Sequence, residues 1–201
     1  MKTLLLSREG FIPSLIALFV FVVVAALECT ILACVAAAVL LYTLWFFRNL
    51  ERIPAESDSL ALIAPIDGKI SDISPSADGT AITIKTGLFD AHLIRSPLQT
   101  NRIERSIRNG ICGALHGNDH LRQIETVAIL NANGGEVVVL LKPTIAPSRF
   151  YKFKNSLFLG ERVGFFYGGE GVVTIAAGAD IRVAVGSIVK AGESVLGFTR
   201  S

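Results

Sequence analysis

A long apolar segment constrains this chain more than any other feature of its sequence. Residues 11–47 contain one ionised side chain, Glu28. As a single helix the segment would be about 55 Å long, whereas the hydrocarbon core of a bilayer is about 30 Å thick. Two shorter helices with a turn at residues 27–30 fit better, because the turn keeps the Glu28 carboxylate away from the bilayer centre. The sequence therefore predicts a transmembrane helical hairpin within residues 1–50.

The basic residues around this segment predict its orientation. Lys2 and Arg8 precede it, Arg48 and Arg52 follow it, and the predicted turn has no basic residue. The positive-inside rule then places both ends in the cytoplasm, so we expect an inner-membrane protein whose domain faces the cytoplasm. The alternative is a cleaved signal peptide, but its apolar core would be much shorter.

Composition excludes several other classes of protein. Hydrophobic residues make up 51% of the chain and charged residues 18%, which is incompatible with disorder. The net charge of +2 is too small to indicate a nucleic-acid partner. The spacing of Cys29, Cys34 and Cys112 matches no zinc pattern and no disulfide framework, so we expect none of these cysteines to bind a metal.

The composition and the hydrophobic pattern of the sequence change after the apolar segment. Residues 51–60 are polar and are predicted to be a linker, and residues 61–201 are rich in short β-branched runs. Residues 127–130 and 136–141 flank a Gly- and Asn-rich turn at hairpin spacing, and further strands are expected at 81–85, 172–176, 181–185 and 194–198. One short helix could cover 118–125. We therefore predict a mainly β fold, α+β at most, as a short-strand sandwich or barrel-like domain.

The C-terminal segment has a pattern of its own. Residues 183–193 resemble the glycine turns of biotinyl- and lipoyl-type hammerhead structures. No lysine hairpin of the kind those carriers modify is present, so a hammerhead-like segment is expected without a carrier function.

Two polar sites could carry chemistry. His116 and His120 lie with Asp119 in a polar loop, which indicates either exposed loop polarity or a metal site. Asp67 stands at the apex of a sharp turn in residues 64–70, and His92 interrupts an apolar strand in residues 87–97. Taken one at a time, these are an ordinary turn aspartate and an ordinary strand histidine.

Taken in order, the motifs resemble the phosphatidylserine decarboxylase family, in its short bacterial and archaeal form. The segments FFRNLERIP (46–54), APIDGK (64–69) and FDAHLIRSP (89–97) are similar to "FFRDPERxxP", "SPADGKV" and "FDVHVNRAP". Residues 8–10 (REG), 160–164 (GERVG), and a C-terminal run through 177–179, 183–186 and 191–196 follow the same order. The resemblance covers nearly the whole chain.

The resemblance implies a specific chemistry. In this family a serine in a Gly-Ser pair cleaves the proenzyme and becomes a pyruvoyl group, which serves as the electron sink for decarboxylation of phosphatidylserine to phosphatidylethanolamine. Asp67 and His92 match the family's acid and histidine, which activate that serine as a triad does. The implied partner is a membrane phospholipid; a homo-oligomer is also compatible with the sequence.

The expected cleavage position departs from the family pattern. It is occupied by Gly168, Gly169 and Glu170, with either Gly169 or Glu170 in the place of the serine. Neither side chain has a hydroxyl. We therefore expect a protein of phospholipid biosynthesis that is not self-processed and forms no pyruvoyl group, a pseudoenzyme candidate. The alternatives are an active pyruvoyl-dependent decarboxylase, cleaved for instance at Ser187, and a non-catalytic scaffold that binds lipid or a partner.

Overall fold

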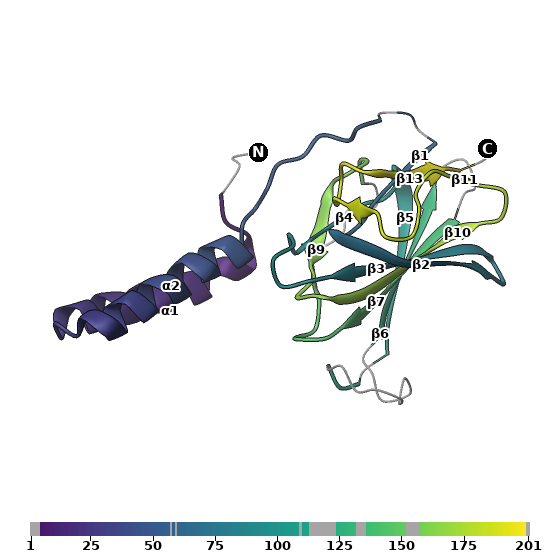
Figure 1. The fold of residues 1–201 in the computed structure, drawn as a ribbon. Helices are drawn as coiled ribbons and strands as arrows, with labels where there is room; N and C mark the ends of the chain where they lie inside the picture. Colours follow the sequence, from purple (N-terminus) through teal and green to yellow (C-terminus); the bar gives the residue numbers. More distant parts are fainter. Residues whose placement is uncertain are drawn as a thin grey trace. The chain divides into compact units, whose positions relative to one another are not determined.

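The computed structural model describes residues 5–56, 58, 60–108, 110–112, 124–131, 136–151 and 157–199. Internal contacts divide the chain into two units, Met1–Glu51 and Arg52–Ser201. Each unit is described by itself below (Figure 1).

The N-terminal unit is a pair of helices lying side by side (Figure 1). A 3-10 turn, η1 (Arg8–Gly10), leads into α1 (Phe11–Ala26), and α2 (Thr30–Phe46) follows after three residues. Glu28 lies in this short connection with a positive φ of 56°, the backbone conformation that reverses the chain. The predicted pair of N-terminal helices is therefore confirmed, with residues 27–29 as the connection.

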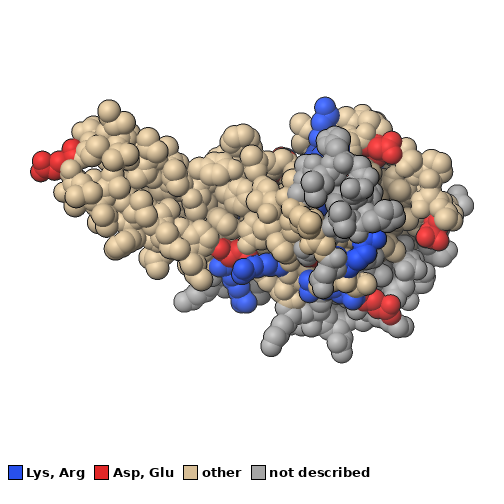
Figure 2. Space-filling model, turned by 90° about the horizontal axis from the view of Figure 1, so that it is seen from below, with Lys and Arg blue, Asp and Glu red and all other residues tan. Residues whose placement is uncertain are grey.

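The surface of this unit is apolar. Phe19, Ile31 and Leu41 are each more than 65% exposed, as are several of their neighbours on both helices. Figure 2 shows uncharged side chains along the length of the unit, with charged groups at its ends. By length and hydropathy, the continuous helical stretch Arg8–Ala26 is long enough to cross a bilayer, whereas Thr30–Phe46 is shorter. An exposed surface of this kind is stable in lipid and unfavourable in water.

The C-terminal unit consists of antiparallel β-sheets, which confirms the predicted mainly β fold. The largest sheet has the strand order β12-β2-β3-β10-β7-β6-β5. Its strands are β12 (Ile188–Val189), β2 (Gly68–Ser76), β3 (Gly79–Thr86), β10 (Gly169–Ala176), β7 (Glu136–Pro143), β6 (Ile124–Asn131) and β5 (Thr100–Arg108).

Two smaller sheets of three strands each accompany it. One has the order β1-β13-β11, built from β1 (Ala61–Ile63), β13 (Val195–Phe198) and β11 (Asp180–Ile181). The other has the order β4-β9-β8, built from β4 (Leu93–Arg95), β9 (Arg162–Phe165) and β8 (Arg149–Phe150).

One hydrophobic core joins the sheets. It contains residues from all three, among them Leu62, Ile84, Ile94, Leu141 and Leu196, which are almost completely buried. Alternate residues of β3 and β10 point into this core, so their neighbours in sequence face outward. This alternation decides which polar residues of the large sheet reach its outer face.

Two local predictions need correction or lie outside the described residues. A strand was expected over 181–185, but β11 ends at Ile181 and the chain turns at residues 184–187. There the Ser187 N–H donates to Ala184 O and the Gly186 N–H to Ile70 O. Of the short helix expected over 118–125, only Ile124 and Glu125 are described, and they begin β6. His116 and His120 lie outside the described residues.

Candidate functional site

The turn that carries Asp67 is held in place from three directions. The carboxylate is buried, with 6% of the residue exposed. It accepts hydrogen bonds from the backbone N–H of Ala191 at 2.7 Å and of Ala91 at 3.4 Å. The hydroxyl of Thr86 donates to the Asp67 carbonyl at 2.6 Å. Asp67 therefore joins the end of β3, the residue before His92 and the C-terminal segment.

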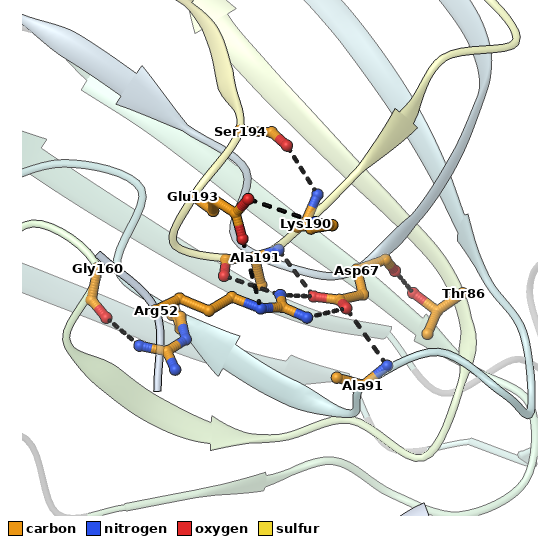
Figure 3. A network of polar contacts seen from close by, with 10 residues as sticks. Arg52, Asp67, Thr86, Ala91, Gly160, Lys190, Ala191, Glu193 and Ser194 are labelled. Atoms are coloured by element: carbon orange, nitrogen blue, oxygen red, sulfur yellow. Dashed lines mark hydrogen bonds and ion pairs between the residues drawn. The ribbon is translucent and has the colours of Figure 1, made fainter. Parts of the chain in front are cut away.

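Arg52 supplies the charge that balances this carboxylate. Its guanidinium forms a two-pronged ion pair with Asp67: Nη1 contacts Oδ1, and Nη2 lies 2.7 Å from Oδ2 (Figure 3). Nη1 also donates to Ala191 O at 3.1 Å, and Nε lies 3.9 Å from a carboxylate oxygen of Glu193. Planar pairing of this kind is the strongest form of charge-assisted hydrogen bonding between side chains.

The electrostatics of Arg52 follow from this arrangement. Burial by itself would lower the pKa of the guanidinium, but the hydrogen bonds and charge of Asp67, with the charge of Glu193, raise the pKa above its ordinary value. Arg52 is therefore charged at every physiological pH, and the Asp67 carboxylate always faces a cation.

His92 is buried and is oriented by backbone atoms. Its Nδ1 lies 2.9 Å from the carbonyl oxygen of Phe166, and the Phe166 N–H donates to His92 O at 2.7 Å. Because a carbonyl only accepts, Nδ1 is the donor in this bond. Nε2 lies 3.5 Å from Leu88 O.

The turn between β9 and β10 passes directly beside this ring. A Cβ on Gly168 would lie 4.0 Å from Cε1 of His92. Gly168 and Gly169 have φ values of 98° and 137°, which side chains rarely tolerate. A Cβ on Gly169 would lie 2.3 Å from the backbone oxygen of Lys142, so no larger residue fits there without movement of β7.

Glu170 is the first residue after this turn that faces outward. It pairs in register with Lys85 of β3 and with Lys142 of β7. Its carboxylate lies 3.4 Å from Nζ of Lys85, and a third of its side chain is exposed. The position accommodates a side chain, which Gly169 does not.

The structure thus brings His92 to the Gly168–Gly169 turn but gives Asp67 a different partner from the expected one. The imidazole is oriented by Phe166 O, and the carboxylate is bound by Arg52. The sequence predicts Arg52 only as a basic residue that flanks the apolar segment, within a polar linker. Its place in the quoted FFRNLERIP motif was the only signal of its role, since no local pattern indicates a partner 15 residues away.

Comparison with known proteins agrees with these motifs. The profile described as phosphatidylserine decarboxylase matches residues 39–197. The chain is 29% identical over 216 residues to the phosphatidylserine decarboxylase proenzyme of Desulfotalea psychrophila, with 95% of each chain covered. It is 28% identical over 207 residues to the proenzyme of the same description from Syntrophus aciditrophicus, with 96% of each chain covered.

No solved structure matches the chain significantly. The profile nevertheless covers well over half of the sequence, and the relatives are similar from end to end. The chain therefore belongs to the phosphatidylserine decarboxylase family.

Proposed function

We propose that this protein is a membrane-anchored member of the family that remains a single chain and binds phospholipid without decarboxylating it. The observation that carries the proposal is the residue at the start of β10. Gly169 and Glu170 are the two positions at which the family pattern can place the serine; neither carries a hydroxyl, and the Glu170 carboxylate is paired with Lys85. A carboxylate has no hydroxyl with which to form the ester that precedes chain cleavage.

The pyruvoyl group of the family does not fit the residues present at this turn. That group is made from a serine of the chain itself, and Gly168, Gly169 and Glu170 offer no precursor. A serine at position 169 would not fit this backbone either, because its Cβ would meet the carbonyl oxygen of Lys142. The backbone geometry favours Glu170 as the equivalent position.

Asp67 and His92 form structural contacts that account for their presence in a chain without catalytic activity. Asp67 binds Arg52 and the backbone of Ala191, and His92, just before β4, forms a hydrogen bond to the Phe166 carbonyl. Loss of either would leave buried polar groups without partners, which costs about 1–3 kcal/mol each. A chain without activity would therefore still depend on both residues for its stability.

The proposed location follows from the hairpin. Its apolar surface suits lipid, and the basic residues at both of its ends favour a cytoplasmic position for those ends. The β unit would then lie at the inner face of the inner membrane, where phospholipid headgroups are accessible. The names of the relatives, phosphatidylserine decarboxylase proenzymes, support a serine phospholipid as the lipid that is bound.

Mass spectrometry of the intact purified protein tests the proposal. We expect one chain of 21.5 kDa and no release of CO₂ from phosphatidylserine. Two chains, the smaller one beginning near residue 170 with a blocked N-terminus, would overturn the proposal.

Restoring the nucleophile is the sharper experiment. In Glu170→Ser we expect slow cleavage before residue 170, because the buried His92 ring lies beside the preceding turn. Glu170→Ala is the matched control and should stay intact, since it removes the same carboxylate without adding a hydroxyl. Glu170→Ser combined with His92→Ala should also stay intact. Cleavage of the Glu170→Ala control would mean that the break does not depend on the restored serine.

A further inference from the structure

A row of charged residues crosses the outer face of the large sheet. Lys69 of β2 pairs in register with Lys85 of β3, Lys85 pairs with Glu170 of β10, and Glu170 pairs with Lys142 of β7. Residues paired directly across antiparallel strands project from the same face. The row therefore presents three ammonium groups and one carboxylate side by side.

The juxtaposition of Lys69 and Lys85 is unfavourable by itself. Like charges directly opposite on neighbouring strands destabilise a sheet. The single carboxylate of the row lies beyond Lys85, 3.4 Å from its Nζ, and so does not stand between the two lysines. An anion bound between Lys69 and Lys85 would remove this repulsion.

A cavity lies at these two lysines. Its volume is about 310 Å³, and its lining consists of Lys69, Ile70, Ser71, Lys85, Val185 and Gly186. The Ser71 hydroxyl donates to Thr83 O at 3.3 Å, so the donors for a ligand are the two ammonium groups. None of the described residues that line the cavity carries a carboxylate.

We propose that this cavity binds the phosphate group of an anionic ligand between Lys69 and Lys85, and that Glu170 acts as a tethered counterion that competes for Lys85. Both a phospholipid headgroup and free inorganic phosphate carry this chemistry. Val185, which is 59% exposed, lines the cavity, and Ile188, which is 77% exposed, pairs in register with Lys69. The apolar residues at the rim favour a phospholipid over inorganic phosphate as the ligand. This preference for a phospholipid rests on the proposed function, whereas the phosphate site itself does not.

Binding is measured with the full chain in an uncharged detergent. The probes are inorganic phosphate and dihexanoyl phosphatidylserine below its micelle concentration, each titrated and followed by phosphorus NMR. We expect Lys85→Gln and Lys69→Gln each to weaken binding about fivefold, the effect of losing one partly exposed ion pair. Glu170→Gln should strengthen binding by a similar factor. Added salt should weaken binding in the unmodified protein, because the lysines are exposed.

Two further variants separate a lost site from a damaged fold. Lys69→Glu turns the opposed lysines into an attractive pair, so it should raise the thermal midpoint while abolishing binding. Lys190→Gln removes one charge from a lysine of similar exposure, 57% against 59% for Lys85, away from the cavity. It should leave binding unchanged.

Each outcome has a definite meaning. Lysine-dependent binding of both probes supports a general phosphate site, and lysine-dependent binding of the lipid alone supports a headgroup site. Binding that is equal in the unmodified protein, Lys69→Glu and Lys190→Gln, or no binding of either probe, would overturn the inference. These titrations do not depend on chain cleavage, so they are independent of the result with Glu170→Ser.

Discussion

At the scale of single residues, the ion pair with Asp67 attaches Arg52, the first residue of the β unit, to the rest of that unit. The two side chains are only 10% and 8% exposed, so neither charge has much access to water. We expect Arg52→Ala to lower the free energy of unfolding by about 2–4 kcal/mol, because it leaves a buried carboxylate without its cation. Arg52→Lys keeps the charge but loses the planar geometry, and should cost about half as much.

Thermal unfolding of the full chain in detergent, followed by circular dichroism, measures this effect. The matched control is Arg182→Ala, which breaks an ion pair with Asp180 whose side chains are both more than 60% exposed. It should cost less than about 1 kcal/mol. Equal losses in the two variants would show that the buried pair contributes no more than a surface pair.

At the scale of the element, β10 begins at a point where only glycine fits. We expect Gly169→Ala to destabilise the fold by about 2–4 kcal/mol, because the new Cβ would meet Lys142 O and the φ of 137° is strained. Gly186→Ala is the matched control: its φ of 93° is also strained, but a Cβ there has no atom within 4 Å. It should cost about 1–2 kcal/mol, the strain alone.

The thermal unfolding midpoints of Gly169→Ala and Gly186→Ala, compared with each other, test the close approach of β10 to β7. If Gly169→Ala is no worse than Gly186→Ala, then β7 moves aside easily, and the preference for Glu170 over Gly169 as the serine-equivalent position loses its geometric basis.

At the scale of the whole molecule, the proposed hairpin determines on which side of the membrane the β unit lies. The chain reverses direction at Glu28, between the two helices. A reagent that binds tags at the two chain ends should therefore reach both of them from the cytoplasmic side alone. A cysteine replacing Glu28, in a chain with its three natural cysteines changed to serine, should react with a membrane-impermeant maleimide from the opposite side. Tags that report opposite sides would contradict the hairpin and favour a single span.

Much of the fold follows from local sequence patterns. The hairpin was predictable because 37 residues with one charge have few stable arrangements, and the connection at residues 27–30 carries that charge. Strands β3, β6, β7, β10 and β13 were predictable from alternation or from β-branched runs, whereas β2, β5 and β9, among others, were not predicted. The strand expected over 181–185 was too long, because the chain turns at residues 184–187, where the Gly186 N–H donates to Ile70 O. A partner so distant in the sequence is not visible in a local window.

Composition, periodicity and short motifs are properties of neighbouring residues, so the sequence alone predicted the two apolar N-terminal helices, the mainly β class and the family. The contacts of the polar residues emerged from the folded chain alone. Arg52 pairs with Asp67, Phe166 O orients His92 from 74 positions away, and strand register lines up Lys69, Lys85 and Glu170. Such contacts depend on strand register and on burial, because a buried charge or ring nitrogen must find a partner wherever the completed fold places one.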